Sequence, residues 1–174
     1  KNFFFWLSEY GKKIINEKNN FFIKSAILKS CRIKARIVNL DEKEKNLRMI
    51  LNFGHTFAHG IEAANSYSRT INHGEAVLIG MILATRLSFR KKICSYNTLD
   101  KIETIYETNN LPKNLTGFFS KKSLNKVVNF MEIDKKNYDN KINLILLKRV
   151  GKTTSPGDFR ISPKEMRNVL KKIS

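Results

Sequence analysis

The sequence predicts a mainly α-helical domain with a small β element late in the chain. Apolar residues recur at helical spacing through most of its length, most strongly from Gly74 to Lys91. There they occupy nearly every side of the helix, which predicts a central, buried helix. Only Lys141–Val150 combines weak alternation with a short apolar run and a following glycine, a pattern typical of a strand. A length of 174 residues and a hydrophobic content of 41% suit one packed domain, or one large lobe of a bigger protein.

The same periodicity places the remaining helices in order along the chain. Helices are expected at Phe3–Ile15, Phe21–Asn39, Leu47–Ala64, Gly74–Lys91, Thr98–Thr108 and Ser123–Phe130, with a last helix that Ser162-Pro163 caps and that ends at Ile173. Turns or loops are expected at Asn19–Asn20, Asp41–Glu44 (a charged turn or a helix start), Asn65–Thr70, Asn109–Pro112, Asp134–Asn140 and Ser155–Asp158. Asn52 and Gly54 are poor helix formers. We therefore attribute the 47–64 helix to close packing or to a ligand.

The chain is strongly basic, with 33 Lys+Arg against 15 Asp+Glu and a net charge of +18. This charge is compatible with a nucleic acid or membrane partner, with an anionic substrate, or with biased composition. Lysines are scattered from Lys1 to Lys172 among many Asn and Ile, whose codons are also A/T-rich, which favours the last two explanations. A concentrated basic stripe or a known nucleic-acid motif is missing. No apolar run approaches the ~20 residues needed to cross a bilayer.

Cysteine usage and the N-terminus indicate a reducing compartment. Cys31 and Cys94 are far apart and lack C-x-x-C spacing, so we expect buried reduced thiols. The segment Lys1–Tyr10 has neither a long apolar region nor a small-residue cleavage site. Because the chain does not begin with Met, we expect its true N-terminus to lie further upstream. The expected localisation is cytoplasmic.

All three histidines lie close together in the sequence, at His55, His59 and His73. Histidine titrates near neutral pH and binds divalent metals as a neutral ligand. A catalytic zinc needs three protein ligands and an open position, and the candidates are these histidines together with Glu62 and Glu75. His55 and His59 have the spacing of H-E-x-x-H helices, but the intervening Thr-Phe-Ala lacks the catalytic glutamate. The alternative is that some of these histidines are hydrogen-bonded core residues.

A polar stripe leads into this cluster. Arg48, Asn52, His55 and His59 are spaced 4, 3 and 4 residues apart, which on one helix places them along one face. Arg recognises carboxylates or phosphates with two hydrogen bonds, and Asn offers a donor and an acceptor to hydroxyls. We therefore expect the stripe to face a pocket for an anionic, hydroxylated and metal-bound ligand.

These residues belong to two longer motifs. The first is Arg48-x3-Asn-Phe-Gly-His-Thr-x2-His59-x-Ile-Glu62, and the second is His73-Gly-Glu-Ala-Val-x-Ile-Gly-Met81. Together they closely resemble the signature of the 3-dehydroquinate synthase family. Lys34-Ala35, Asp41-Glu42-x-Glu44-x2-Leu47-Arg48 and Asp134-Lys-Lys136 also fit, in the same order. The resemblance covers nearly the whole chain, although related sugar-phosphate cyclases share the framework.

The resemblance implies roles for individual residues. His55 and His73 match two zinc ligands, whereas His59 matches a histidine that contacts substrate and transfers protons. His55 and His59 would therefore not be a shared metal clamp. The positions that match catalytic or substrate-binding residues are His59, Lys34, Glu44, Arg48, Asn52, Lys135 and Lys136. Lys34, Arg48 and Asn52 match residues that hold the substrate carboxylate, hydroxyls or phosphate, and Lys135 and Lys136 match a lysine pair in a loop near the substrate.

The implied reaction belongs to the shikimate pathway of aromatic amino acid biosynthesis. It converts 3-deoxy-D-arabino-heptulosonate 7-phosphate to 3-dehydroquinate and phosphate. The steps are transient oxidation by NAD, phosphate elimination, re-reduction, ring opening and aldol closure. Zinc, or another divalent metal such as Co²⁺, polarises the substrate hydroxyl and later the carbonyl.

The chain departs from the family in its extent. Family members carry an N-terminal Rossmann-like half that binds NAD and ends with a glutamate, the third zinc ligand. This sequence has no G-x-G-x-x-G after a strand and no residue that matches that glutamate. Residues 1–174 therefore look like the C-terminal domain, without NAD-binding residues of its own. It should be active only with an NAD-binding half on the same or a separate polypeptide, as a homodimer. The alternatives are a related cyclase, an inactive remnant and, more distantly, a basic helical nucleic-acid-binding protein.

Two smaller departures concern small residues. The family usually has Gly and Ala where this chain has Ala58 and Gly60. A methyl group at 58 should crowd a close contact, and Gly60 should loosen the helix by up to ~1 kcal/mol. Asn46 replaces a usual glycine, and we expect this change to be mild because Asn tolerates left-handed backbone.

Overall fold

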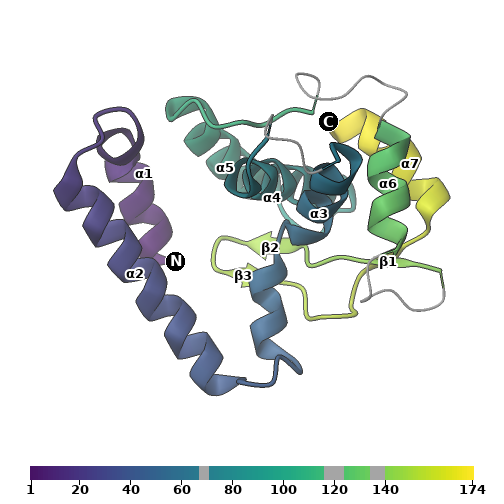
Figure 1. Cartoon of the computed structure of the whole chain (residues 1–174), viewed down its shortest axis with the longest axis horizontal. Coiled ribbons are helices and arrows are strands. Elements are labelled where there is room, and N and C mark those ends of the chain that lie inside the picture. The colour runs from purple at the N-terminus through teal and green to yellow at the C-terminus, as the bar shows by residue number, and fades with distance from the viewer. Residues whose placement is uncertain (67–70, 116–123, 134–139) are drawn as a thin grey trace.

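A computed structural model describes residues 1–66, 71–115, 124–133 and 140–174. Over these residues helices dominate and short strands come late, which confirms the mainly α fold with a small late β element (Figure 1). The elements are α1 (Asn2–Ile15), α2 (Asn20–Leu40), the 3-10 helix η1 (Leu47–Asn52), α3 (His55–Ala64), α4 (His73–Arg90), α5 (Tyr96–Thr108), α6 (Leu124–Ile133), β1 (Ile142–Asn143), β2 (Leu147–Arg149), β3 (Lys152–Thr153), β4 (Arg160–Ile161) and α7 (Pro163–Ile173). In the described parts, no helix is long and apolar enough to cross a membrane.

Helix α4 is the central helix, as its sequence predicts. It begins with a capping box, in which the Asn72 side chain accepts from the backbone N–H of Glu75 and the Glu75 carboxylate accepts from that of Asn72. Its buried residues are Ala76, Ile79, Gly80, Ile82, Leu83, Ala84, Thr85, Leu87 and Ser88. They lie on several sides because α4 packs against α3, α5, α7 and β2. The whole domain is therefore assembled around this helix.

The predicted helix over 47–64 is wrong as a single element. Residues 47–52 form η1, the chain breaks at Phe53–Gly54, and α3 begins at His55. Gly54 has a φ of +84°, in the left-handed region that a right-handed helix cannot include. Arg48 and Asn52 therefore do not share one helical stripe with the histidines of α3.

The break allows α3 to meet α4 at backbone distance. A Cβ added to Gly80 would lie 2.1 Å from the carbonyl oxygen of Gly54, and one added to Gly54 would lie 2.7 Å from the backbone nitrogen of Met81. Two glycines thus permit an approach that any side chain would prevent. This contact sets where α3 begins relative to α4.

The exchange of small residues at 58 and 60 has a packing consequence. Ala58 is fully buried. Gly60 faces α6, where an added Cβ would lie 2.8 Å from the carbonyl oxygen of Val127 and 2.7 Å from Met131 Cγ. Gly60 therefore lets α3 approach α6, which offsets its cost in helix propensity.

The late β element is smaller than expected. The predicted strand over Lys141–Val150 is split into β1 and β2, because its two parts pair with different segments. β1 is antiparallel to β4, with Ile142 opposite Ile161, and β2 is antiparallel to β3, with Leu147 opposite Thr153. The backbone N–H of Leu147 donates to Ser88 Oγ over 2.9 Å, which attaches β2 to α4.

The caps predict the helix ends better than the apolar periodicity does. α7 begins as predicted, with Ser162 accepting from the backbone N–H of Glu165 and Pro163 following. α5 begins at Tyr96, before the predicted Thr98, because Ser95 caps it. α6 extends to Ile133, beyond the predicted Phe130. Parts of the expected loops, 67–70 and 134–139, lie outside the described residues.

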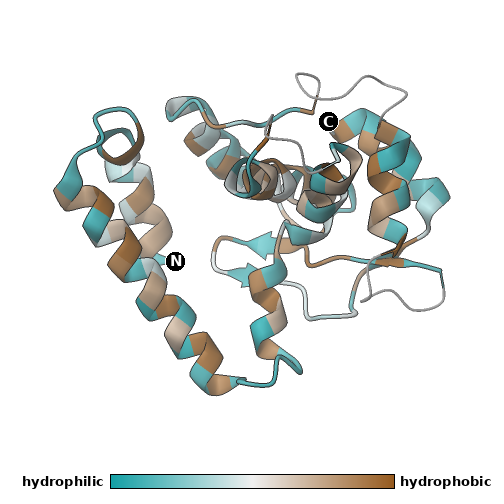
Figure 2. Ribbon diagram, viewed as in Figure 1, coloured by the Kyte–Doolittle hydropathy of each residue, from teal (hydrophilic) through white to brown (hydrophobic). Residues whose placement is uncertain are grey.

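Helices α1 and α2 form a hairpin at one side of the molecule (Figure 1). Aromatic side chains join the two helices, with the Tyr10 and Phe22 rings stacked at 4.8 Å. α2 has no buried residue, and apolar residues occur along its ribbon (Figure 2). Cys31 on α2 is exposed, so the expectation of two buried thiols is wrong for it; Cys94 is buried, which raises the pKa of its thiol. The difference arises because α2 does not enter the core.

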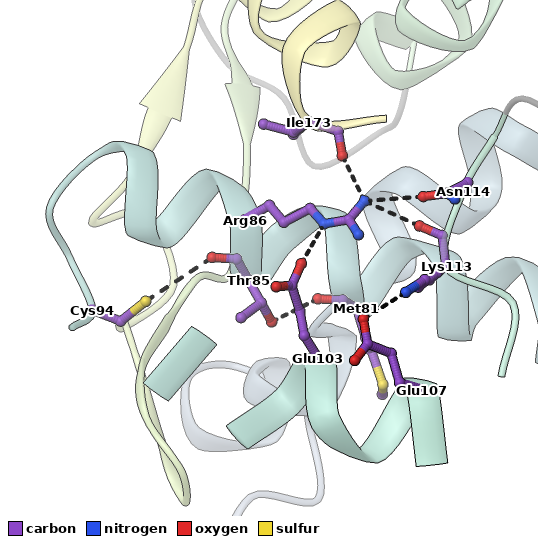
Figure 3. A network of polar contacts seen from close by, with 9 residues as sticks. All are labelled: Met81, Thr85, Arg86, Cys94, Glu103, Glu107, Lys113, Asn114 and Ile173. Carbon is purple, nitrogen blue, oxygen red and sulfur yellow. Dashed lines mark hydrogen bonds and ion pairs between the residues drawn. The ribbon is translucent and has the colours of Figure 1, made fainter. Parts of the chain in front are cut away.

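Arg86 connects α4 to the segments around its C-terminal half (Figure 3). Its Nε donates to Glu103 Oε1 on α5 over 2.9 Å. Its Nη1 donates to the carbonyl oxygens of Lys113 and Ile173 and to Asn114 Oδ1, over 2.9 to 3.3 Å. A planar guanidinium can serve these divergent acceptors where an ammonium group could not. Arg86 thereby holds the end of α7 and the segment after α5 against the central helix.

The Gly54–Gly80 contact generates a stability prediction. Gly80→Ala should lower the free energy of unfolding by about 3 kcal/mol, the upper part of the usual range for overpacking, because the new methyl meets rigid backbone. Gly74→Ala on the same helix is the matched control. An added Cβ there meets only Asn72 Oδ1, at an ordinary 3.4 Å, so it should stabilise by up to ~1 kcal/mol. Denaturant unfolding measures both, and equal effects would contradict the close contact.

Candidate functional site

The three histidines converge where α3 and α4 begin. His55 is the first residue of α3, His59 follows one turn later, and His73 is the first residue of α4. The His55 ring centroid lies 5.9 Å from that of His59 and 5.8 Å from that of His73. His55 is half-buried, while His59 and His73 are exposed. The α3–α4 contact thus brings the imidazoles of two helices together.

One histidine is held by a carboxylate. His73 Nδ1 lies 2.9 Å from Glu62 Oε1, which bridges the start of α4 to the last turns of α3. Glu62 lies on the same face of α3 as both histidines of that helix, since it follows His55 by seven residues and His59 by three. An ionised carboxylate only accepts hydrogen bonds, so it pairs with a ring that carries hydrogen on Nδ1.

The other candidate carboxylate has a structural role. Glu75 is part of the capping box of α4, where its Oε2 accepts from the backbone of Asn72. Among the residues that the structure describes, no group of three His, Cys, Asp or Glu side chains is arranged to hold a metal ion. Within those ranges the histidine rings approach one another in pairs. The five candidate ligands, which are the three histidines, Glu62 and Glu75, do not come together around one point.

The donor set nevertheless fits a zinc or cobalt ion between two helices. Two imidazoles on one tetrahedral zinc have ring centroids roughly 5 Å apart, given Zn–N bonds of about 2.0 Å. The separation of 5.8 Å between His55 and His73 is close to that value. His55 and His59 are similarly spaced, so distance alone does not choose between the pairs. His73 has a carboxylate partner, an arrangement typical of metal-bound histidines.

The polar segment before α3 is organised by Asp41. Its carboxylate accepts from the backbone N–H groups of Lys45, Asn46 and Arg48 over 2.9 to 3.0 Å. These hydrogen bonds, that of Arg48 above all, lower the pKa of Asp41. Asn46 has a φ of −147°, so this position does not require left-handed backbone. The left-handed residue of this segment is Glu44, with a φ of +51°.

This conformation brings Glu44 to Asn52. Asn52 Nδ2 donates to Glu44 Oε1 over 2.9 Å, and Arg48 Nη1 donates to the carbonyl oxygen of Glu42 over 2.9 Å. Glu44, Arg48 and Asn52 therefore form one polar group, which η1 and Gly54 connect to His55. A helical stripe does not produce this grouping. The Asp41 turn and the 3-10 helix produce it.

Of the three predicted lysines, the structure describes only Lys34. Lys34 is exposed on α2, in the hairpin at the side of the molecule (Figure 1). Lys135 and Lys136 lie outside the described residues. Sequence reasoning assigned no role to Asp41 as an organiser or to Glu62 as a histidine partner. The position of Glu62 at i+7 from His55 and i+3 from His59 is the signal that could have drawn attention to it.

Comparison with known proteins gives a consistent family. A family model described as 3-dehydroquinate synthase C-terminal matches residues 1–137. A protein named 3-dehydroquinate synthase from Pelagibacter ubique (strain HTCC1062) is 49% identical over 151 residues, which are 87% of this chain and 41% of that protein. The chain thus spans about two fifths of the length of this relative.

Solved structures share the fold at lower identity. A 2-epi-5-epi-valiolone synthase from Streptomyces hygroscopicus subsp. jinggangensis 5008, with NAD⁺ and Zn²⁺ bound, has a TM-score of 0.78 and 18% identity, covering 99% of this chain and 46% of that one. A 2-deoxy-scyllo-inosose synthase complexed with carbaglucose-6-phosphate, NAD⁺ and Co²⁺ has a TM-score of 0.57 and 23% identity, covering 75% of this chain and 35% of that one. The fold is therefore that of the sugar-phosphate cyclases, and the chain belongs to the 3-dehydroquinate synthase family.

Proposed function

We propose that this chain is the metal- and substrate-binding part of a 3-dehydroquinate synthase, a phosphorus–oxygen lyase. The substrate is 3-deoxy-D-arabino-heptulosonate 7-phosphate, and the products are 3-dehydroquinate and phosphate. The observation that carries the proposal is the approach of His55 and His73 across α3 and α4, with Glu62 bound to His73. The relative at 49% identity bears the name of this enzyme.

His55 and His73 are the residues that would hold the metal. Zn²⁺ and Co²⁺ are the ions present in the two structural neighbours, and both accept imidazole ligands. When bound, the ion polarises a substrate hydroxyl and the carbonyl derived from it. A third ligand would come from outside this chain.

His59 is left for proton transfer. It stands one turn after His55 on α3 and is exposed, so a substrate held at the metal pair would lie beside its imidazole. Imidazole exchanges protons near neutral pH, which suits the eliminations and additions of this reaction. We therefore assign His59 to catalysis rather than to metal binding.

The basic and amide side chains would bind the anionic substrate. Arg48 offers a fork of donors to carboxylate or phosphate, and the Asn52–Glu44 pair offers polar atoms to hydroxyls. We propose Lys34, Lys135 and Lys136 as further contacts. The net charge of +18 would raise the local concentration of an anionic substrate.

The remaining parts of the enzyme lie beyond this chain. NAD⁺ is bound in both structural neighbours, of which the chain covers less than half. We propose that NAD is held mainly by a half that the chain does not include, on the same or a separate polypeptide. We further propose that the assembled enzyme is a cytoplasmic homodimer.

Reconstitution tests this proposal directly. The chain, assembled with the NAD-binding half of a relative and supplied with NAD and Zn²⁺, should release phosphate and 3-dehydroquinate from the heptulosonate phosphate. The chain alone should not. Turnover of another sugar phosphate in preference to the heptulosonate phosphate would instead support a related cyclase, and no turnover of either would support an inactive remnant.

Substitutions of the two exposed histidines, His73 and His59, should have different effects on zinc binding and on kcat. His73→Ala should weaken zinc binding by more than the roughly 10–100-fold that loss of an outer-shell partner costs, since a ligand is removed. His59→Ala should leave zinc binding unchanged and lower kcat of the reconstituted enzyme roughly 10²–10⁴-fold. Calorimetric zinc titration and phosphate release measure the two effects. Equal zinc loss in both variants would contradict the assignment.

The Asp41 turn generates a pH prediction. Because hydrogen bonds lower the pKa of Asp41 in the folded chain, the ionised carboxylate stabilises it above the unfolded pKa of about 3.9, and this contribution is lost as the pH falls through the folded value. Asp41→Asn should therefore lower the denaturant midpoint at pH 7 and raise KM for the heptulosonate phosphate. The midpoints of the two proteins should converge only as the pH falls from about 3.9 through the lowered pKa of Asp41.

Glu42→Gln is the control for this prediction, since it removes the same charge one residue away. It should leave the midpoint and KM close to those of the unaltered chain. A midpoint difference between Asp41→Asn and the unaltered chain that stays constant down to acid pH would show that ionised Asp41 does not organise the turn.

A further inference from the structure

We infer that Glu62 is a positioning residue that selects the metal-binding form of His73, holding the ring with hydrogen on Nδ1 and the lone pair on Nε2. The inference rests on the proposed function and deepens it. It concerns a residue that the family resemblance does not match to a zinc ligand. The contact that carries it is the 2.9 Å approach of Glu62 Oε1 to His73 Nδ1.

The two partners differ in how firmly they are held. The Glu62 side chain is 15% exposed, whereas that of His73 is 60% exposed. Glu62 projects from α3, which packs against both α4 and α6, so its carboxylate has a fixed place. His73 is the first residue of its helix and could otherwise rotate about its side-chain bonds, at an entropic cost to any ligand that must fix it. The carboxylate therefore orients the histidine.

The carboxylate also decides the protonation pattern of the ring. A neutral imidazole carries one proton, on either nitrogen, and binds metal through the other. Glu62 accepts a hydrogen bond only if that proton is on Nδ1, which leaves Nε2 available. The negative charge also makes Nε2 a more basic ligand. Without Glu62 both tautomers become accessible, and one of them presents N–H where the metal must bind.

The second carboxylate near His73 cannot replace Glu62. Glu75 lies two residues after His73, but its side chain accepts from the backbone of Asn72 in the capping box. It therefore provides a matched control. Glu75→Gln removes one negative charge from the same helix turn, and glutamine also serves in capping boxes.

The test is the tautomer of His73 in the full chain without metal. Nitrogen-15 NMR of histidine-labelled protein, recorded at about pH 8.5 where imidazoles are neutral, distinguishes the two nitrogens by their couplings to the ring protons. His73 should be protonated on Nδ1 in the unaltered chain and in Glu75→Gln. In Glu62→Gln, which keeps the side-chain volume, and in Glu62→Ala, it should shift towards a mixture of tautomers.

Metal affinity provides the second measurement. Zn²⁺ competition with a chelator should show binding weakened roughly 10–100-fold in Glu62→Gln and unchanged in Glu75→Gln. Protonation of His73 on Nε2 in the unaltered chain would overturn the inference whatever the affinity. So would an unchanged tautomer in Glu62→Ala. A chain that shows the Nδ1 tautomer but takes up no zinc when assembled with the NAD-binding half of a relative would retain the positioning contact and contradict the proposed function, which keeps the two failures distinct.

Discussion

The backbone contact between Gly54 and Gly80 is the constraint on which the site depends. It places the first turn of α3 directly against the middle of α4, at a distance that permits no side chain at either position. The same contact requires the left-handed conformation of Gly54, which ends η1 and begins α3. Because α4 is the buried centre of the domain, whatever α3 carries is held relative to a rigid frame. The histidines at the starts of both helices are therefore held at fixed positions relative to each other.

Three carboxylates support the site. From their spacing in the sequence they could be metal ligands or plain acidic residues, but each holds another group in place. Glu62 holds His73, Glu75 caps α4, and Asp41 orders the segment that bears Arg48. In each case a negative charge accepts from a ring or backbone N–H, a favourable use of a carboxylate near a helix end or turn. In the proposed function, the groups left to bind the ligand are imidazoles, an amide and a guanidinium. This division suits an anionic ligand and a metal cation that takes nitrogen ligands.

The sequence predicted those features that depend on local chemistry. The central helix followed from apolar residues on all its sides, and the last helix followed from Ser162 and Pro163. The break at Gly54 did not follow, since a glycine inside an apolar pattern is compatible with either a helix or a turn, and only the contact with Gly80 decides it. The Glu62–His73 pair is a tertiary contact between α3 and α4. Apolar periodicity does not determine how these two helices are placed relative to each other. The exposure of Cys31 was missed because α2 has helical periodicity without a core to bury it.

The central claim is that a metal joins α3 to α4, through His55 and His73, and does not join two turns of α3. Anomalous diffraction at the zinc edge, from crystals of the chain grown with Zn²⁺, tests it most directly. The account predicts one peak about 2.0–2.1 Å from His73 Nε2 and from a ring nitrogen of His55, with His73 Nδ1 still bound to Glu62. A peak shared by His55 and His59, with His73 turned away, would contradict it.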